Sequence, residues 1–355
     1  MTILRGCIGW LAACLLAVPV YAEGMRALTA ADFLRQPYRG FTLDNGSSKT
    51  AADFDDLAAM GANLVRIGIT LERCAKCRDY TIPPKFLLDV DQVLALAEPR
   101  GIHLILTLVP ERPEHAAYWE DATLQASIVD VWSRLAERYK DKPAMGGFDL
   151  INEPNPPGRA KEAHRRYAEF AGRLIEAVRR IDPQRMIVYE PAPRGNTFYA
   201  FKELKTPLPY DNVLYSPHFY HPVDITHQGV GKQPHGEPYP TSEWNKALLS
   251  ERLEPVREFA RKYKLPIYMG EFGCVRDAPG DTTYRWIKDV ADLLEAEGWS
   301  WTFHSFRGWH GWDPELPARA PKPVSAAAAK NVRSMYTPVM ALLRGYLNKS
   351  RPPSP

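Results

Sequence analysis

Residues 102–108 read Ile-His-Leu-Ile-Leu-Thr-Leu, and an amphipathic segment follows this apolar run from Leu124 to Tyr139. An apolar run without alternation is typical of a parallel strand that is covered on both faces. In the second segment the apolar side chains recur at helical spacing and share one helix face. The stretch therefore predicts a strand followed by a helix that packs on it, which is the repeating unit of α/β folds.

The same unit recurs along the whole chain. We expect eight strands, at residues 38–43, 63–69, 102–108, 147–151, 186–189, 213–216, 267–269 and 300–304. We expect helices at residues 51–60, 87–98, 124–139, 167–181, 243–263, 283–297 and 326–347. Eight such units predict an α/β fold of the (β/α)8 TIM-barrel type, with residues 23–348 as a single domain. An open doubly wound sheet is the alternative, but the glycine-rich phosphate loop expected of it is not found in the sequence.

The two ends of the chain differ in composition from this domain. Residues 1–22 are typical of a secretory signal peptide, with Arg5 before an apolar run and Val20-Tyr21-Ala22 at the cleavage position. We therefore expect a secreted or periplasmic protein that is cleaved after Ala22. A lipid anchor at Cys14, in Leu11-Ala12-Ala13-Cys14, is the alternative. Residues 349–355 are expected to form a disordered tail.

Charge and cysteine content restrict the partners. Lys and Arg number 45 and Asp and Glu number 42, so the formal charge is only +3 (45 − 42), and no nucleic-acid partner is expected. No other stretch is long enough to span a membrane. Cys74 and Cys77 fit a local disulfide or inert thiols, because no further ligands for a zinc site are visible at similar spacing. We expect a monomer.

Polar residues follow several of the expected strands, at the end where barrels of this type carry their sites. Two of them are carboxylates, Glu153 after the fourth strand and Glu271 at the end of the seventh. These strand ends lie across the barrel mouth from each other. Two carboxylates facing each other across a cleft are the minimum that glycoside hydrolysis requires. Each could instead have a structural role, Glu153 in a turn and Glu271 as a helix cap.

Four short motifs resemble those of glycoside hydrolase family 5, the cellulase family. They are Leu150-Ile151-Asn152-Glu153-Pro154, Ile267-Tyr268-Met269-Gly270-Glu271-Phe272-Gly273, Val65-Arg66 and His218-Phe219-Tyr220. They occur in the family's order and cover essentially the whole mature chain. The resemblance implies a (β/α)8 barrel and a retaining mechanism, with Glu153 as acid/base and Glu271 as nucleophile.

The resemblance also implies supporting roles. Arg66 and a hydroxyl hydrogen bond from Tyr220 would keep Glu271 ionised. Asn152 would bind the sugar 2-hydroxyl, and His218 would orient Glu153 or bind sugar. The chain departs from the family in two places. Val109-Pro110-Glu111 stands where a histidine is usual, and His304 stands where the family usually has a tryptophan platform.

Aromatic residues cluster around the eighth strand. Trp301, Trp309 and Trp312 lie on or just after it, and tryptophans at a barrel rim suggest sugar subsites, with core packing as the alternative. We expect one of them to form a flat wall beside His304. The histidines of residues 218–235 fit no regular pattern of metal ligands, so neither a metal nor a cofactor is expected.

Together these features predict an exported retaining endo-β-glycosidase. Its substrate would be a β-glucan or β-mannan polysaccharide or oligosaccharide. A glycosidase acting on a bacterial exopolysaccharide is one alternative. The other is a catalytically silent carbohydrate-binding protein on the same fold, although a binding protein has no need of the pair Glu153 and Glu271.

Overall fold

The computed structural model describes residues 25–44, 48–73, 80–109, 119–318 and 326–350. The signal peptide, Cys14 and the pair Cys74 and Cys77 lie outside these residues. The barrel strands are β1 (Arg39–Leu43), β2 (Leu64–Thr70), β5 (His103–Val109), β6 (Met145–Asp149), β7 (Ile187–Tyr189), β8 (Val213–Tyr215), β9 (His218–Phe219), β10 (Tyr268–Phe272) and β11 (Ser300–Phe303). A two-stranded hairpin, β3 (Glu72–Arg73) with β4 (Tyr80–Thr81), follows β2.

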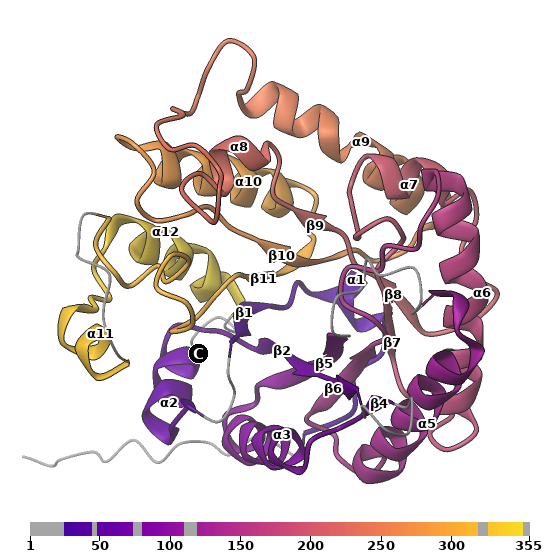
Figure 1. Ribbon diagram of the computed structural model, residues 1–355. Helices are drawn as coiled ribbons and strands as arrows, with labels where there is room; N and C mark the ends of the chain where they lie inside the picture. Colours follow the sequence, from indigo (N-terminus) through magenta and orange to yellow (C-terminus); the bar gives the residue numbers. More distant parts are fainter. Residues whose placement is uncertain (1–24, 45–47, 74–79, 110–118, 319–325, 351–355) are drawn as a thin grey trace, which may run out of the picture.

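The strands form a parallel sheet in the order β8-β7-β6-β5-β2-β1-β11-β10-β9. A bridge between Tyr215 on β8 and Ile267 just before β10 joins the two sides of this sheet. The short strand β9 continues β8 beyond Pro217 and pairs with the end of β10. The sheet is therefore a closed (β/α)8 barrel, and Figure 1 shows its strands as an inner ring surrounded by helices.

The helices cover the outside of the barrel. They are α1 (Asp32–Arg35), α2 (Ala51–Ala59), α3 (Pro84–Ala97), α5 (Ala122–Tyr139), α6 (Ala160–Arg179), α7 (Tyr199–Glu203), α8 (Val223–Thr226), α9 (Lys246–Tyr263), α10 (Thr282–Ala296), α11 (Ala326–Val332) and α12 (Pro338–Leu347), with 3-10 turns η2 (Glu98–Arg100) and η3 (Asn348–Ser350). The long helices confirm the periodicity read from the sequence. The short helices α1, α7 and α8 were not anticipated, because each is about one turn long and has no repeating apolar pattern.

Local side chains fix where these helices begin. Asp121 caps α5 by accepting hydrogen bonds from the amides of Thr123 and Leu124, and Thr50 forms a capping box with Asp53 at the start of α2. The single helix expected over 326–347 is wrong. Thr337 caps a new helix and Pro338 is its first residue, and a proline disfavours helical backbone at the preceding residue.

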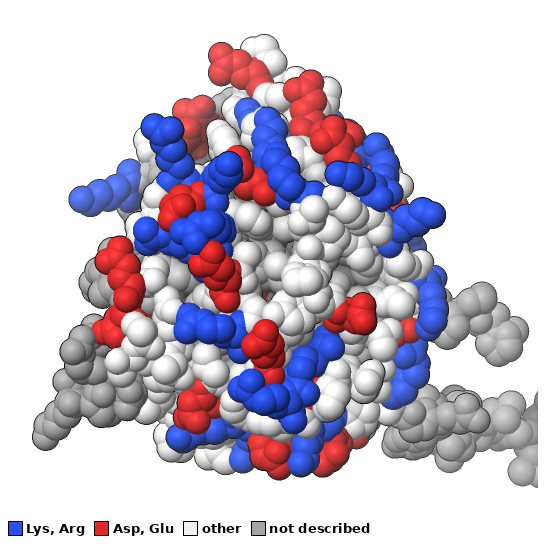
Figure 2. Space-filling view, turned by 90° about the vertical axis from the view of Figure 1, so that its right-hand side faces the viewer, with Lys and Arg blue, Asp and Glu red and all other residues white. Residues whose placement is uncertain are grey.

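The C-terminal end is also more ordered than expected. Lys349 and Ser350 belong to η3 rather than to a disordered tail, and the Ser350 hydroxyl accepts a hydrogen bond from Arg39 on β1. On the face shown in Figure 2, Lys and Arg side chains are interspersed with Asp and Glu side chains, in keeping with the small net charge. Within the described residues, no helix combines the length and apolar character needed to cross a membrane.

Candidate active site

A cavity of about 440 Å³ opens at the carboxyl ends of the strands, within the size range of ligand sites. Residues from most of the barrel strands and from the loops that follow them line it. They are Thr42, Leu43, Asp44, Arg66, Gly68, Thr107, Val109, Asn152, Glu153, Tyr220, His227, Val230, Glu271, His304 and Trp312. The structure thus brings together seven sequence-predicted side chains around one space, and His218 lies directly behind it.

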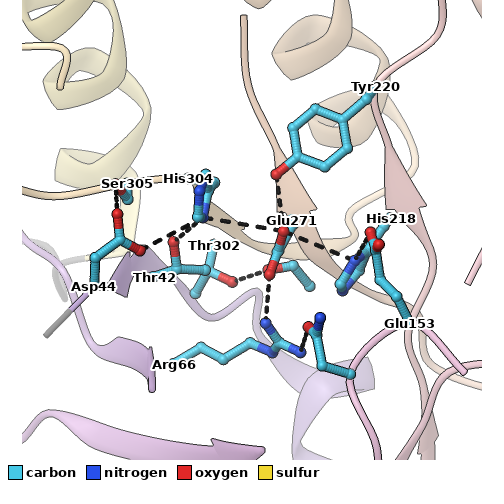
Figure 3. Close-up of polar contacts among 12 residues, drawn as sticks. Thr42, Asp44, Arg66, Glu153, His218, Tyr220, Glu271, Thr302, His304 and Ser305 are labelled. Atoms are coloured by element: carbon cyan, nitrogen blue, oxygen red, sulfur yellow. Dashed lines mark hydrogen bonds and ion pairs between the residues drawn. The ribbon is translucent and has the colours of Figure 1, made fainter. Parts of the chain in front are cut away.

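Glu271, on β10, is at the centre of this site (Figure 3). Arg66 donates a hydrogen bond of 2.7 Å to Oε1, and the Tyr220 hydroxyl donates one of 2.8 Å to Oε2. Burial raises the pKa of Glu271, but the positive charges of His218, His304 and Arg66 and the bond from Tyr220 outweigh burial and lower this pKa to about 2. Glu271 is therefore a carboxylate at neutral pH.

Glu153 approaches the same space from the loop after β6. Its side chain is 29% exposed, and its Oε1 lies 3.0 Å from His218 Nδ1. Ligand atoms of Glu153, His218 and Glu271 all lie within 4.8 Å of one another. The two carboxylates therefore face each other at short range across the cavity.

His218, on β9, lies between the two carboxylates and is buried. Its Nδ1 is 3.9 Å from Glu271 Oε2 as well as close to Glu153. Gly270 leaves the space for this ring, because a Cβ there would come within 2.8 Å of His218 Nε2. Burial lowers the pKa of His218, but the charges of Glu190 and Glu271, the hydrogen bond to Glu153 and the 3.4 Å contact with Glu190 raise it well above its usual value. His218 is thus an imidazolium ion.

Arg66, on β2, holds four oxygen-bearing side chains in place. Besides Glu271 it donates to Asp149 at 2.9 Å, to Asn152 at 2.8 Å and to Glu190 at 2.7 Å. Asp149 and Glu190 were not assigned to the site from the sequence, although both stand at strand ends. Each is 0% exposed. The sequence signal that could have identified them is their position at the carboxyl end of a predicted strand, like that of Arg66.

The other wall of the cavity contains His304, which follows β11. Its Nδ1 lies 2.7 Å from the Thr42 hydroxyl and 4.0 Å from both Asp44 Oδ1 and Glu271 Oε2. Asp44 in turn accepts a hydrogen bond from the Ser305 hydroxyl. This wall is polar where the family usually has a tryptophan. Thr42 and Asp44 follow from no motif of the sequence and were missed.

The three tryptophans near β11 lie in three different places. Trp312 lines the cavity, is 8% exposed and contacts Tyr220, His227 and His304 through its ring. Trp309 is 41% exposed and lines a neighbouring cavity of about 830 Å³. Asp44 lines both cavities.

The suggestion that Trp301 belongs to a sugar subsite is wrong. Its side chain is 0% exposed, and its indole N–H donates to Glu295 of α10 on the outside of the barrel. Successive side chains of a strand point to opposite faces. Trp301 therefore points away from the interior, which Thr302 faces through its bond to the Gly270 carbonyl.

A metal ion is a second possibility for the three residues at the centre. The spacing of Glu153, His218 and Glu271 could hold a cation. However, His218 Nδ1 already lies 3.0 Å from Glu153 Oε1, and Arg66 occupies one oxygen of Glu271. The contacts within the site therefore favour carboxylates that act on an organic substrate.

The sequence matches the family described as Cellulase (glycosyl hydrolase family 5) over residues 31–308. The chain belongs to glycoside hydrolase family 5. The family's description is that of glycoside hydrolases, which favours a hydrolytic site over a catalytically silent binding protein. Among solved structures, the endoglucanase Cel5A of Thermotoga maritima has a TM-score of 0.71 and 23% identity, with 87% of this chain and 99% of that chain covered. At this identity the likeness shows the fold.

The names of proteins with similar sequences refer to more than one glycan. A beta-xylosidase of Phanerodontia chrysosporium is 25% identical over 73% of this chain and 56% of its own length. Endoglucanase C of Acetivibrio thermocellus is 27% identical over 50% of this chain and 58% of its own length. The chain thus spans a little over half the length of these relatives.

Proposed function

We propose that this family 5 hydrolase is an exported, retaining endo-β-glycosidase that uses Glu271 as nucleophile and Glu153 as acid/base. The observation that carries the proposal is the short separation of the two carboxylates, whose nearest ligand atoms lie within 4.8 Å. Retaining enzymes separate their carboxyl groups by about 5–5.5 Å, whereas inverting enzymes need roughly 6.5–9.5 Å to admit a water molecule.

The reaction would proceed in two steps. In the first, Glu271 attacks the anomeric carbon and forms a glycosyl ester, while Glu153 gives its proton to the leaving oxygen. In the second, Glu153 takes a proton from water, and the resulting hydroxide oxygen displaces Glu271 from the sugar. Asn152, which is oriented by Arg66, would hydrogen-bond the sugar 2-hydroxyl, a contact that strengthens in the transition state.

The charges of the site support Glu153 as the proton donor. The cluster contains four carboxyl groups, those of Asp149, Glu153, Glu190 and Glu271, and two cations, Arg66 and His218. Burial and the nearby charge of Glu190 raise the pKa of Asp149 well above its usual value, but Asp149 is 0% exposed and does not line the cavity.

Neither Glu271 nor Glu190 is available as the proton donor. Glu271 is ionised, and the pKa of Glu190, which burial alone would raise, is lowered by His218 and Arg66. Glu153 is the most exposed of the carboxyl groups next to His218, and it lines the cavity. It is therefore the carboxyl group that is placed to exchange a proton with a substrate.

The substrate we propose is a β-glucan or a β-mannan chain. The names of the relatives point to β-linked glycans, and the second cavity supplies room beyond the reacting sugar. Trp309 and Asp44 border that cavity, and a Cβ at Gly311 would collide with the Trp309 ring. The indole is thus packed against the loop at Gly311, while Trp309 remains 41% exposed. We expect it to stack on a further sugar ring, as an endo-acting enzyme requires.

Product stereochemistry tests the roles of the two carboxylates. With an aryl β-glycoside whose phenol leaves without protonation, Glu153→Ala should keep its first step, and added azide should give the β-glycosyl azide. With Glu271→Ala, azide should attack the substrate directly and give the α-azide, because the carboxylates flank the anomeric carbon from opposite faces. NMR of the products distinguishes the two. The reverse pattern would exchange the roles, and near-native activity of both variants on polysaccharide would place the site elsewhere.

Chain length tests the second cavity. Trp309→Ala should lower kcat/KM about tenfold or more on long oligosaccharides, since a stacked aromatic ring contributes on the order of 1–2 kcal/mol, and should leave an aryl monoglycoside unaffected. Release assays over glucans, mannans and bacterial exopolysaccharides would identify the chain that is cut. Equal losses on short and long substrates would contradict the stacking role.

Export is tested on the mature protein. We expect an N-terminus at Glu23, immediately after the proposed cleavage position. Sequencing of the N-terminus from the secreted or periplasmic fraction measures it. A lipid-modified Cys14 at the start of the mature chain would instead support the lipid anchor.

A further inference from the structure

Glu190 is a buried carboxylate directly behind the two reacting groups. It follows β7 and has three partners from three other segments of the barrel. Its Oε2 accepts the backbone N–H of Glu153 at 2.8 Å. Its Oε1 accepts a 2.7 Å bond from Arg66 and lies 3.4 Å from His218 Nε2. Glu190 itself does not line the cavity.

We propose that Glu190 is a positioning residue that orients Glu153 through its main chain and keeps His218 protonated during both steps of the reaction. The proposal rests on the proposed function of Glu153 and Glu271. In this proposal Glu190 does not contact the substrate. It affects the reaction only through Glu153 and His218.

The first part of the argument concerns the backbone. Glu153 has a φ of 47°, a left-handed conformation that residues with a Cβ seldom adopt. The hydrogen bond from its N–H to Glu190 holds that conformation, and the carbonyl of the next residue, Pro154, accepts the amide of Arg194. Gly195 lies so close that a Cβ there would be 3.3 Å from Glu190 Oε2. The carboxylate is therefore confined, and the turn that carries Glu153 is fixed to it.

The second part concerns charge. During the first step negative charge leaves Glu271, which becomes an ester, and appears on Glu153, which has lost its proton. His218 lies 3.0 Å from one and 3.9 Å from the other, so a permanent imidazolium stabilises the charge in either place. An imidazolium buried between groups that change charge needs a partner whose charge stays constant. Glu190 is that partner.

Among the residues that the structure describes, few other charges surround His218. Glu153 faces it from the loop after β6, Glu190 from the end of β7 and Glu271 from β10. Arg66, on β2, lies behind these carboxylates, and His304 is on the far side of Glu271. Of the three carboxylates, Glu190 alone takes no part in bond making. Its removal should therefore release the proton of His218.

Nitrogen NMR of the histidine ring tests the charge. The signal of His218, assigned by its absence in His218→Gln, should not titrate between about pH 5 and pH 8 in the wild-type protein, which spans the usual range of histidine. In Glu190→Gln it should titrate within that range. A His218 signal that stays protonated in Glu190→Gln would overturn this part of the proposal. This measurement needs no substrate, so it stands even if the proposed hydrolysis fails.

Leaving-group dependence tests the positioning of Glu153. Glu190→Gln should slow release of a natural sugar leaving group by about 10- to 100-fold, part of the effect of a general acid, and slow a dinitrophenyl glycoside less than about threefold. Glu295→Gln is the matched control, because the Glu295 carboxylate is only 11% exposed and pairs with Arg39 on the outside of the barrel. It should change both rates equally. Equal losses in Glu190→Gln would refute a positioning role.

A shortened side chain distinguishes the role of Glu190 in holding the Glu153 backbone from its role in keeping His218 protonated. It also provides a second test if Glu190→Gln does not fold. Glu190→Asp keeps the charge near His218 but withdraws the oxygen that holds the Glu153 amide. His218 should then stay protonated, while the loss remains confined to poor leaving groups. Loss of protonation in Glu190→Asp, or an unaltered rate on natural substrates, would contradict the inference.

Discussion

The hydroxyl of Tyr220 should set the acidic limit of the reaction. Tyr220→Phe removes a hydrogen bond of 2.8 Å to Glu271 and leaves the ring in place. Burial first, and then the charge of Glu271, raise the pKa of Tyr220 well above its usual value, so the phenol donates throughout the neutral range. The variant therefore removes a donor that stabilises only the ionised form of Glu271.

The expected size follows from that bond. A hydrogen bond to a charged group contributes about 1.5–3 kcal/mol, and one pKa unit corresponds to about 1.4 kcal/mol. Loss of the donor should raise the pKa of Glu271 by about one to two units, starting from about 2. Since kcat/KM needs ionised Glu271 in the free enzyme, activity at acidic pH should be lost first. The midpoint of the acid limb should move to about pH 3–4.

Initial rates on a dinitrophenyl β-glycoside between about pH 2 and pH 8 measure this limb, because that leaving group does not depend on Glu153. Circular dichroism at each pH confirms that the protein is folded. Tyr239→Phe is the matched control: its hydroxyl also donates to a carboxylate, Asp289, at 2.8 Å, but lies away from the cavity. An acid limb that stays in place or moves to lower pH would refute the role assigned to Tyr220.

Two further substitutions separate packing from catalysis. Trp301→Ala should lower the free energy of unfolding by about 3–5 kcal/mol, as expected for a fully buried indole, and leave KM unchanged; denaturant unfolding and steady-state kinetics measure both, and a raised KM would return Trp301 to the binding site. Gly270→Ala places a Cβ within 2.5 Å of Ser216 Oγ and 2.8 Å of His218 Nε2, so it should displace the imidazole and slow natural substrates at least about 100-fold. A crystal structure with His218 unmoved, together with normal rates, would contradict that expectation.

The strand pattern predicted the barrel because both faces of each strand are buried, and this leaves long apolar runs in the sequence. It also predicted where Arg66, Glu153 and Glu271 would meet, since each stands at the carboxyl end of its strand. Trp301 was wrongly assigned to a sugar subsite because the alternation of side chains along the strand was not taken into account. Trp301 and His304 are three residues apart, so they point to opposite faces, and only one of them can face the cavity.

The strand-end position of Glu190 is visible in the sequence, but its role could not be predicted in the same way, and neither could the place of Asp44. Each acts through partners on distant segments, and the distances depend on how the barrel curves. Glu190 meets the Glu153 amide only because that residue adopts left-handed backbone. Asp44 belongs to the site because it lines both cavities. No local pattern in the sequence indicates such a position.

The closure of the barrel also determines when it can form during synthesis. β1 pairs with β11, and Arg39 binds Glu295 and Ser350, so the first strand of the barrel has to wait for the synthesis of its last strand and of residue 350. Until then one edge of β1 has no neighbour, and open edges of this kind are prone to aggregation. Contacts so distant in sequence also slow folding. A nascent chain that is released before residue 300 would therefore lack the strand that closes the ring, and its folding would depend on chaperones that shield the open edge.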